Sequence, residues 1–274
     1  MDAWRRAVEH VAARSAGGPL PPDARVTVHF HPDRCSGGAT VLERIVAEGT
    51  YRSQFSTGIS NGGLTAHPGG DRWRWESRMF GGAYDEAASH ERPVYGAVEH
   101  RRRATGGAIR FGSCWLEVAR TAWDRVTLCW PDSVYEPEHL GTPAHAGELL
   151  ALADEAAVDP LDDYVEAQLH GGFEPARDAE RLVLDPAFRG AAVERAAARL
   201  GVPIVWHPGL ELRVDRIAEL EAYRGVDALA LALELAVDGR IDARILGEAA
   251  EAHDQQTIKR VWHLIARFGH RVAD

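Results

Sequence analysis

The sequence predicts an α+β fold in which a mixed β core is followed by a mostly helical C-terminal portion. Short β-rich segments and loops alternate before Asp178, whereas the chain beyond it is rich in alanine and in apolar residues at helical spacing. The 274 residues are enough to bury a sizeable core. We expect an N-terminal helix and linker over 1–24, an α+β body over 25–190 and the mostly helical portion over 191–274.

Local composition predicts the elements of the first part in order. An amphipathic helix within residues 1–18 precedes a proline-rich linker over 17–23. The β-rich stretch 25–31 ends at Pro32, and a helix over 40–48 ends at Gly49. Further strands are expected at 94–99, 108–118, 125–129 and 163–170, and a helix at 149–157.

Beyond Asp178 the same criteria predict helices with a single strand between them. The helices are expected at 190–200, 214–221, 225–237 and 241–268, and the strand at 202–207.

Charge and cysteine content exclude several classes of protein. There are 31 basic and 41 acidic side chains, a formal charge of −10, which argues against general affinity for nucleic acid or anionic membranes. No run of about 18 apolar residues occurs, so no membrane span is expected. Three cysteines without a CxxC spacing indicate neither a disulfide framework nor a thiolate zinc site. A reducing cytoplasm is the expected location.

Glycine is concentrated where a binding site is expected. Residues 36–113 contain 14 of the 27 glycines. Within them, 51–63 combines hydroxyl, amide and arginine side chains, which suits recognition of a polar ligand or, alternatively, a turn-rich surface loop. The following stretch, 68–84, contains Arg72, Arg74, Arg78, Trp73 and Trp75. These suit stacking and phosphate contact, or else an exposed helix with two buried tryptophans.

Two histidines on the first predicted strand could begin a metal site. His29 and His31 lie two residues apart, so their imidazoles share one strand face. Spacing alone does not select the remaining ligands, and the alternative is one core histidine with an incidental neighbour. The possible further ligands are Asp71, His100, Asp163, His170 and His207.

A third group of polar residues lies on the predicted strand at 163–170. Alternation places Glu166, Gln168 and His170 on one face. Polar groups facing a core are costly unless they are paired. The pattern therefore indicates either a solvated sheet face or a cleft carboxylate flanked by an amide.

Three elements, in their order along the sequence, resemble the core of bacterial ADP-ribosyltransferases. They are the strand with His29, His31 and Arg34, the Ser56–Thr57 pair, and the strand with Glu166 and Gln168. The runs 29–34, 51–63, 92–97 and 162–168 resemble more closely a bacterial family, common in actinobacteria, that is named only as a domain of unknown function. This closer resemblance extends from about Arg25 to Gly190.

The resemblance implies NAD as substrate and assigns roles by position. It makes Glu166 the catalytic carboxylate, flanked by Gln168, and Ser56 and Thr57 the element that shapes the nicotinamide pocket. His29, His31 or Arg34 would anchor the ribose or a phosphate, and both the histidine and the arginine version of the anchor stay open. Tyr51, Arg52 and Asn61 complete the expected NAD-binding set. Here Glu166 precedes Gln168, whereas transferases of the arginine-serine-glutamate type usually place Gln or Glu two residues before the catalytic glutamate.

The resulting hypothesis is an α+β enzyme with an ADP-ribosyltransferase-like core that transfers ADP-ribose from NAD to an acceptor or to water. The acceptor could be a protein, a nucleic acid or a small molecule, and no metal is required. The alternatives are a metal-dependent hydrolase built on His29 and His31, and a noncatalytic module that binds a nucleotide or a protein.

Overall fold

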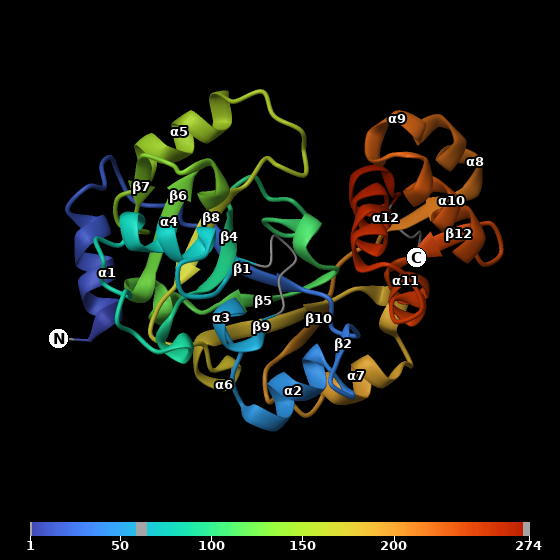
Figure 1. Ribbon diagram of the computed structural model, residues 1–274, viewed down its shortest axis with the longest axis horizontal. Coiled ribbons are helices and arrows are strands. Elements are labelled where there is room, and N and C mark those ends of the chain that lie inside the picture. Colours follow the sequence, from blue (N-terminus) through green and yellow to red (C-terminus); the bar gives the residue numbers. More distant parts are fainter. Residues whose placement is uncertain (1, 59–64, 271–274) are drawn as a thin grey trace. The chain divides into compact units, whose positions relative to one another are not determined.

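The computed structural model describes residues 2–58 and 65–270, which divide into two compact units (Figure 1). The first unit contains residues up to 28, 49–108 and 116–181; the second contains 29–48, 109–115 and residues from 182 onward. Both units are therefore discontinuous in sequence.

An eight-stranded mixed sheet forms the β core. Its hydrogen-bonding order is β10-β9-β5-β1-β4-β8-β6-β7. The strand β10 pairs with β9 in parallel, whereas β1–β4, β4–β8, β8–β6 and β6–β7 are antiparallel pairs. The bounds are β1 Arg25–Phe30, β4 Val94–Glu99, β5 Cys114–Val118, β6 Val126–Trp130, β7 His139–Gly141, β8 Val165–Leu169, β9 Ala179–Leu184 and β10 Ile204–Trp206.

In the first unit, α1 (Ala3–Ala12) buries one apolar face. Ala3, Ala7 and Val11 recur every four residues and are buried. They pack with Phe80 and Tyr84, which follow α4 (Asp71–Met79), and with Cys129 of β6. The short α3 (Gln54–Thr57), α5 (Gly147–Glu155) and α6 (Pro175–Asp178) complete the α-helices of this unit among the described residues.

The second unit is mainly helical outside its share of the sheet. Two small antiparallel pairs accompany its helices, β2 (Cys35–Ser36) with β3 (Ala39–Thr40), and β11 (Glu211–Arg213) with β12 (Arg240–Asp242). The longest helix, α12, contacts α9, α10 and α11, as the orange and red ribbons of Figure 1 show. The helices are α2 Val41–Glu48, α7 Ala192–Ala197, α8 Val214–Ile217, α9 Glu221–Arg224, α10 Val226–Leu235, α11 Ala243–Ala249 and α12 Gln255–Phe268.

Most predicted elements are confirmed within a few residues, and several predictions are wrong. The helix expected at 241–268 is two helices, because Asp254 accepts a hydrogen bond from the Thr257 N–H at 2.8 Å and caps a new helix. The strand expected at 108–118 begins only at Cys114, after a 3₁₀ turn at Ile109–Phe111. The strands β9, β11 and β12 were not expected, because a single strand at 202–207 was predicted beyond Asp178. Among the described residues, no helix has the length and apolar character needed to span a bilayer.

Candidate functional site

A row of polar side chains crosses the two neighbouring strands β6 and β8 in the first unit. The register pairs Thr127 with Gln168 and Cys129 with Glu166, so these four side chains share one face of the sheet. All four are buried. This confirms the predicted common face of the β8 polar residues, whereas the solvated sheet face considered as an alternative is wrong.

These residues form a hydrogen-bonded chain with a fixed direction. Thr127 Oγ1 donates to Gln168 Oε1 at 2.7 Å and lies 2.8 Å from His170 Nε2. Since a hydroxyl has one proton, His170 Nε2 must donate to Thr127, and His170 Nδ1 accepts from the Tyr84 hydroxyl at 2.7 Å. Burial and the charge of Arg125 lower the pKa of His170 to about 3, so the ring is neutral. The hydrogen-bonded chain therefore extends from Tyr84 through His170 and Thr127 to Gln168.

Glu166 is the acceptor at the end of this chain. Gln168 Nε2 donates to its Oε1 at 2.8 Å, and Ser133 Oγ donates to its Oε2 at 3.0 Å. The residue is 5% exposed. Burial and the nearby charge of Asp132 raise the pKa of Glu166 to about 8, although Arg72 and the two hydrogen bonds act in the opposite direction. The result is a positioned carboxylate whose charge is poorly compensated.

Arg72 supplies positive charge beside Glu166. It is 7% exposed, and its guanidinium lies over the rings of Trp75 and Tyr95, at 4.8 and 4.3 Å from their centroids. Its Nε and Nη1 are buried and have no hydrogen-bond partner among the described residues. Buried donors of this kind are rare in folded proteins, so these two nitrogens are candidate contacts for an acceptor group of a ligand.

A buried ion pair holds α4 against β4. Arg92 Nη1 contacts Glu76 Oε2 at 2.6 Å, and the Tyr95 hydroxyl donates to Glu76 Oε1 at 2.8 Å. Arg92 Nη2 also donates to the Tyr84 carbonyl at 2.8 Å. These contacts fix the helix that contains Arg72 and the residue that begins the hydrogen-bonded chain.

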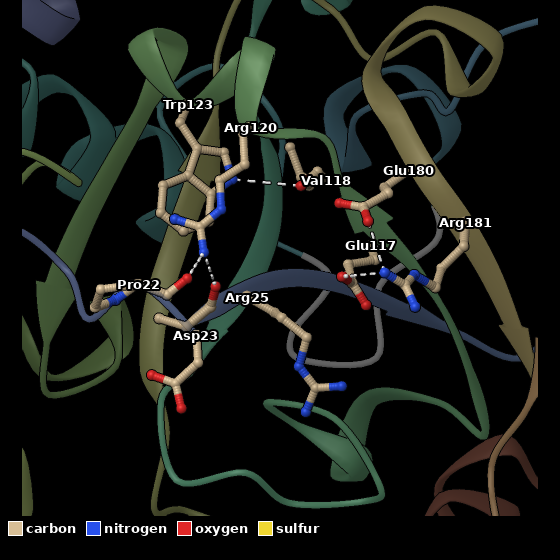
Figure 2. A pocket seen from close by; sticks show the side chains of 10 residues that line it. Pro22, Asp23, Arg25, Glu117, Val118, Arg120, Trp123, Glu180 and Arg181 are labelled. Atoms are coloured by element: carbon tan, nitrogen blue, oxygen red, sulfur yellow. Dashed lines mark hydrogen bonds and ion pairs between the residues drawn. The ribbon is translucent and has the colours of Figure 1, made fainter.

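The first unit also contains a pocket of about 300 Å³ beside the segment 22–25 (Figure 2). Its arginines are largely satisfied: Arg120 donates to the carbonyls of Pro22 and Ala24 and covers the ring of Trp123. Arg181 contacts Glu117 at 3.5 Å and Glu180 at 2.6 Å. This pocket therefore has a weaker claim to an anionic ligand than the Arg72 region.

The predicted anchor residues lie in the second unit. His29 stacks on Trp115 with 5.0 Å between ring centroids, and its Nδ1 lies 3.1 Å from the Gly112 carbonyl oxygen. Gly112 also lies against the backbone of Phe30, and this contact requires glycine because a Cβ at position 112 would lie 2.2 Å from the Phe30 carbonyl carbon. His31 meets the ring of Trp262 edge-on at 4.9 Å. Burial lowers the pKa of both histidines to about 3 and also lowers that of Arg34.

Four of the remaining predicted NAD-binding residues lie in the first unit, in or next to α3. Tyr51 packs against Phe173 with 6.0 Å between ring centroids, and Arg52 is exposed. The Ser56 hydroxyl is 3.3 Å from that of Ser53, and the Thr57 hydroxyl donates to the Ser53 carbonyl at 3.2 Å. These hydroxyls satisfy local groups, as the surface-loop alternative predicts. Asn61 lies outside the described residues.

The other histidines and aspartates considered as metal ligands have separate partners. His100 contacts Asp154 at 2.8 Å, and Asp163 pairs with Arg101 at 2.5 Å. His207 uses both ring nitrogens, 2.8 Å from the Ser113 carbonyl and 3.0 Å from the Gly209 N–H. Within residues 2–58 and 65–270, no group of three or more His, Cys, Asp and Glu side chains is arranged to hold a metal ion.

Sequence reasoning missed part of the chain that ends at Glu166. It did not identify Thr127, Ser133 or Tyr84, because their partners depend on strand register and on packing over the sheet. Thr127 was detectable in principle, since it is a polar residue inside the apolar run 126–130. The stretch 68–84 forms a helix with a buried face: Arg72 and Trp75 are buried, whereas Arg74 and Arg78 are exposed and paired with Asp71 and Glu136.

Comparison with family models gives two matches to one family, described as "Protein of unknown function (DUF3626)", over residues 25–159 and 146–268. Together the matches span most of the chain. The chain belongs to the DUF3626 family. This confirms the expected membership of a domain-of-unknown-function family. All the residues that form the hydrogen-bonded chain from Tyr84 to Glu166 lie within the matched ranges. No curated protein matches the sequence.

Proposed function

We propose that this protein is an ADP-ribosyltransferase-like enzyme that cleaves the bond between nicotinamide and ribose in NAD. ADP-ribose passes to an acceptor (a protein, a nucleic acid or a small molecule) or to water. The observation that carries the proposal is Glu166, a buried carboxylate fixed by donors on both oxygens, beside Arg72, two of whose nitrogens have no hydrogen-bond partner among the described residues. The proposal includes an ADP-ribosyltransferase-like arrangement of the mixed sheet.

The proposed reaction needs a carboxylate that is held in a fixed position and shielded from water. When the bond between ribose C1′ and the nicotinamide nitrogen breaks, its electron pair leaves with nicotinamide and positive charge develops on the sugar. A lone pair of the acceptor then bonds to C1′, and the acceptor loses a proton. A fixed negative charge in a site shielded from water stabilises the cationic transition state.

The raised pKa of Glu166 fits a cationic substrate. Burial and Asp132 disfavour the ionised carboxylate in the free protein. The nicotinamide ring of NAD carries a positive charge, which lowers the pKa of a neighbouring carboxyl group. Substrate binding would therefore favour ionised Glu166, the form that stabilises the developing charge.

Arg72 would bind an anionic part of the substrate. Its Nε and Nη1 have no hydrogen-bond partner among the described residues, and phosphate oxygens accept strong hydrogen bonds from guanidinium N–H groups. Different oxygens of a diphosphate would satisfy the two donors. The rings of Trp75 and Tyr95 fix the plane of the guanidinium before the ligand arrives.

A cytoplasmic location also fits this proposal, because Cys35, Cys114 and Cys129 are all free thiols. NAD is available in that compartment.

Nicotinamide release from NAD tests the proposal. Glu166→Gln is expected to reduce the rate roughly 100- to 1,000-fold, the usual cost of removing one positioned electrostatic group. Glu117→Gln is the matched control. Glu117 is another buried glutamate on a strand of the same unit, and its ion-pair partner is Arg181, which is not a member of the hydrogen-bonded chain. Equal rates for wild type and Glu166→Gln would remove Glu166 from the mechanism. Binding of NAD without any nicotinamide release would support a noncatalytic nucleotide-binding module instead.

A further inference from the structure

Helix α10 of the second unit, labelled in Figure 1, carries apolar residues on its exposed side as well as on its buried side. Its inner side packs against α8, α9 and α12. On the outer side, Val226 is 59% and Leu233 is 47% exposed, and Ala230 between them is exposed too. A surface helix ordinarily turns polar side chains to solvent, so this outer side has the composition of a covered surface.

The exposed apolar residues form one stripe. Val226, Ala230 and Leu233 follow each other at steps of four and three residues, which is the spacing of the seam between two packed helices. Val237, just beyond the end of α10, adds the next step of four and is 54% exposed. Among the described residues of the second unit, every exposed large apolar side chain belongs to this α10 stripe. Single apolar residues scattered over a surface are normal, whereas a contiguous stripe indicates a contact surface.

Acidic residues border the α10 stripe. Asp227 and Glu234 each follow a stripe residue and lie seven residues apart, so they share one flank of the helix. Asp238 follows Val237 in the same way. All three are exposed, and none of them forms a salt bridge with another described residue. Glu234 lies in the last turn of α10, where negative charge is unfavourable for the helix dipole, so its charge does not stabilise its own helix.

Other exposed acidic residues of the second unit are paired locally. Salt bridges join Asp215 to Arg213 at 3.2 Å, Glu219 to Arg216 at 3.3 Å and Glu248 to Arg244 at 2.7 Å. The acidic residues beside the α10 stripe differ from these, because their charges are not balanced within the unit. They are therefore placed to pair with positive charges of another molecule that covers the stripe.

We propose that the α10 stripe is the docking surface for a basic amphipathic helix of a partner protein. The apolar side of that helix covers the stripe, and its lysines or arginines pair with Asp227, Glu234 and Asp238. A second copy of the chain fits less well, because an antiparallel pair of α10 helices would bring Asp227 of one copy beside Glu234 of the other. The proposal requires no role of Glu166.

Binding of a designed peptide to the full chain tests the proposal. The probe is a fluorescent two-heptad helix with leucine at the seam positions and lysine at the remaining ones, and its twin carries glutamate in place of lysine. Fluorescence anisotropy at about 0.15 M salt, where distant surface charges are screened, compares the two. The lysine peptide is expected to bind at least roughly tenfold more tightly than the glutamate peptide.

One substitution separates docking on the stripe from general attraction between opposite charges. Leu233→Glu adds a negative charge at an exposed helix position, where glutamate is a good helix former. General attraction predicts tighter binding of the lysine peptide by this variant, whereas docking on the stripe predicts binding at least roughly tenfold weaker. The matched control is Leu152→Glu, at an exposed leucine of α5 in the first unit, which is expected to bind as wild type does.

The charge contribution has its own variant. Glu234→Lys is expected to weaken binding of the lysine peptide and to strengthen binding of the glutamate peptide. Absence of binding by the lysine peptide, or equal affinities of Leu233→Glu and Leu152→Glu, would overturn the proposal. Sedimentation equilibrium that shows a wild-type dimer abolished by Leu233→Glu would also overturn it, because a second copy would then occupy the stripe. Since nicotinamide release is not measured, this proposal and the proposed function can fail separately.

Discussion

At the scale of single residues, Glu166 combines burial with hydrogen bonds to both carboxylate oxygens. Its position beside Gln168 on one strand face could be predicted from the period of two residues in a β-strand. Its donors could not, because Ser133 lies 33 residues away in sequence and reaches it only through the fold. The predicted roles of His29, His31 and Arg34 remain predictions, and their side chains belong to the second unit.

The raised pKa of Glu166 predicts a pH-dependent stability difference. Between the ordinary pKa of 4.5 and the folded value of about 8, the folded state keeps a proton that the unfolded state has lost. The unfolding free energy of the wild type therefore falls as pH rises through this window, by at most about 1.4 kcal/mol per pH unit from this group. Glu166→Gln lacks this loss.

Urea unfolding of both proteins from pH 5 to pH 9 measures the effect. The stability of Glu166→Gln relative to wild type is expected to increase with pH up to about pH 8. A difference that stays constant over this range would show that Glu166 titrates normally in the folded protein.

At the scale of elements, the strand periodicity located β1, β4, β6 and β8 well. Pairing and register were not accessible, because they depend on contacts between segments distant in sequence. The α11–α12 boundary was missed although Asp254 is a typical N-cap residue, since apolar spacing continues on both sides of it. The hydrogen-bonded chain from Tyr84 to Glu166 depends on the register between β6 and β8, because that register places Thr127 opposite Gln168.

The substitution Thr127→Val tests the hydrogen-bonded chain at its centre. Valine has nearly the shape of threonine but leaves Gln168 Oε1 and the His170 Nε2–H without a partner in the core. We expect a loss of unfolding free energy of roughly 1–3 kcal/mol for each orphaned group. Thr121→Val, at an exposed position, is expected to change stability by less than about 0.5 kcal/mol. Equal urea midpoints for the two variants would contradict the chain as described.

At the scale of the whole molecule, each unit is assembled from separated stretches of sequence. Composition indicated a helical portion after residue 190 but could not indicate that residues 29–48 and 109–115 pack with it, because that grouping is a property of long-range contacts. The absence of a long apolar run agrees with the described helices, none of which could span a bilayer, whereas the expectation drawn from the net charge stays a prediction.

This organisation predicts that a fragment of residues 1–190 does not fold alone. Its stretches 29–48 and 109–115 would lose the residues beyond 190 with which they form the second unit. Circular dichroism during heating should show no cooperative transition for the fragment and one for the full chain. A cooperative transition in the fragment would instead support a domain boundary at residue 190.

Nicotinamide release from NAD by the full chain, compared with its Glu166→Gln and Glu117→Gln variants, is the most direct test of the central claim. Our account predicts release by the wild type and by Glu117→Gln, and a rate at least roughly 100-fold lower for Glu166→Gln. Release at the same rate by all three proteins, or by none of them with any acceptor, would contradict it.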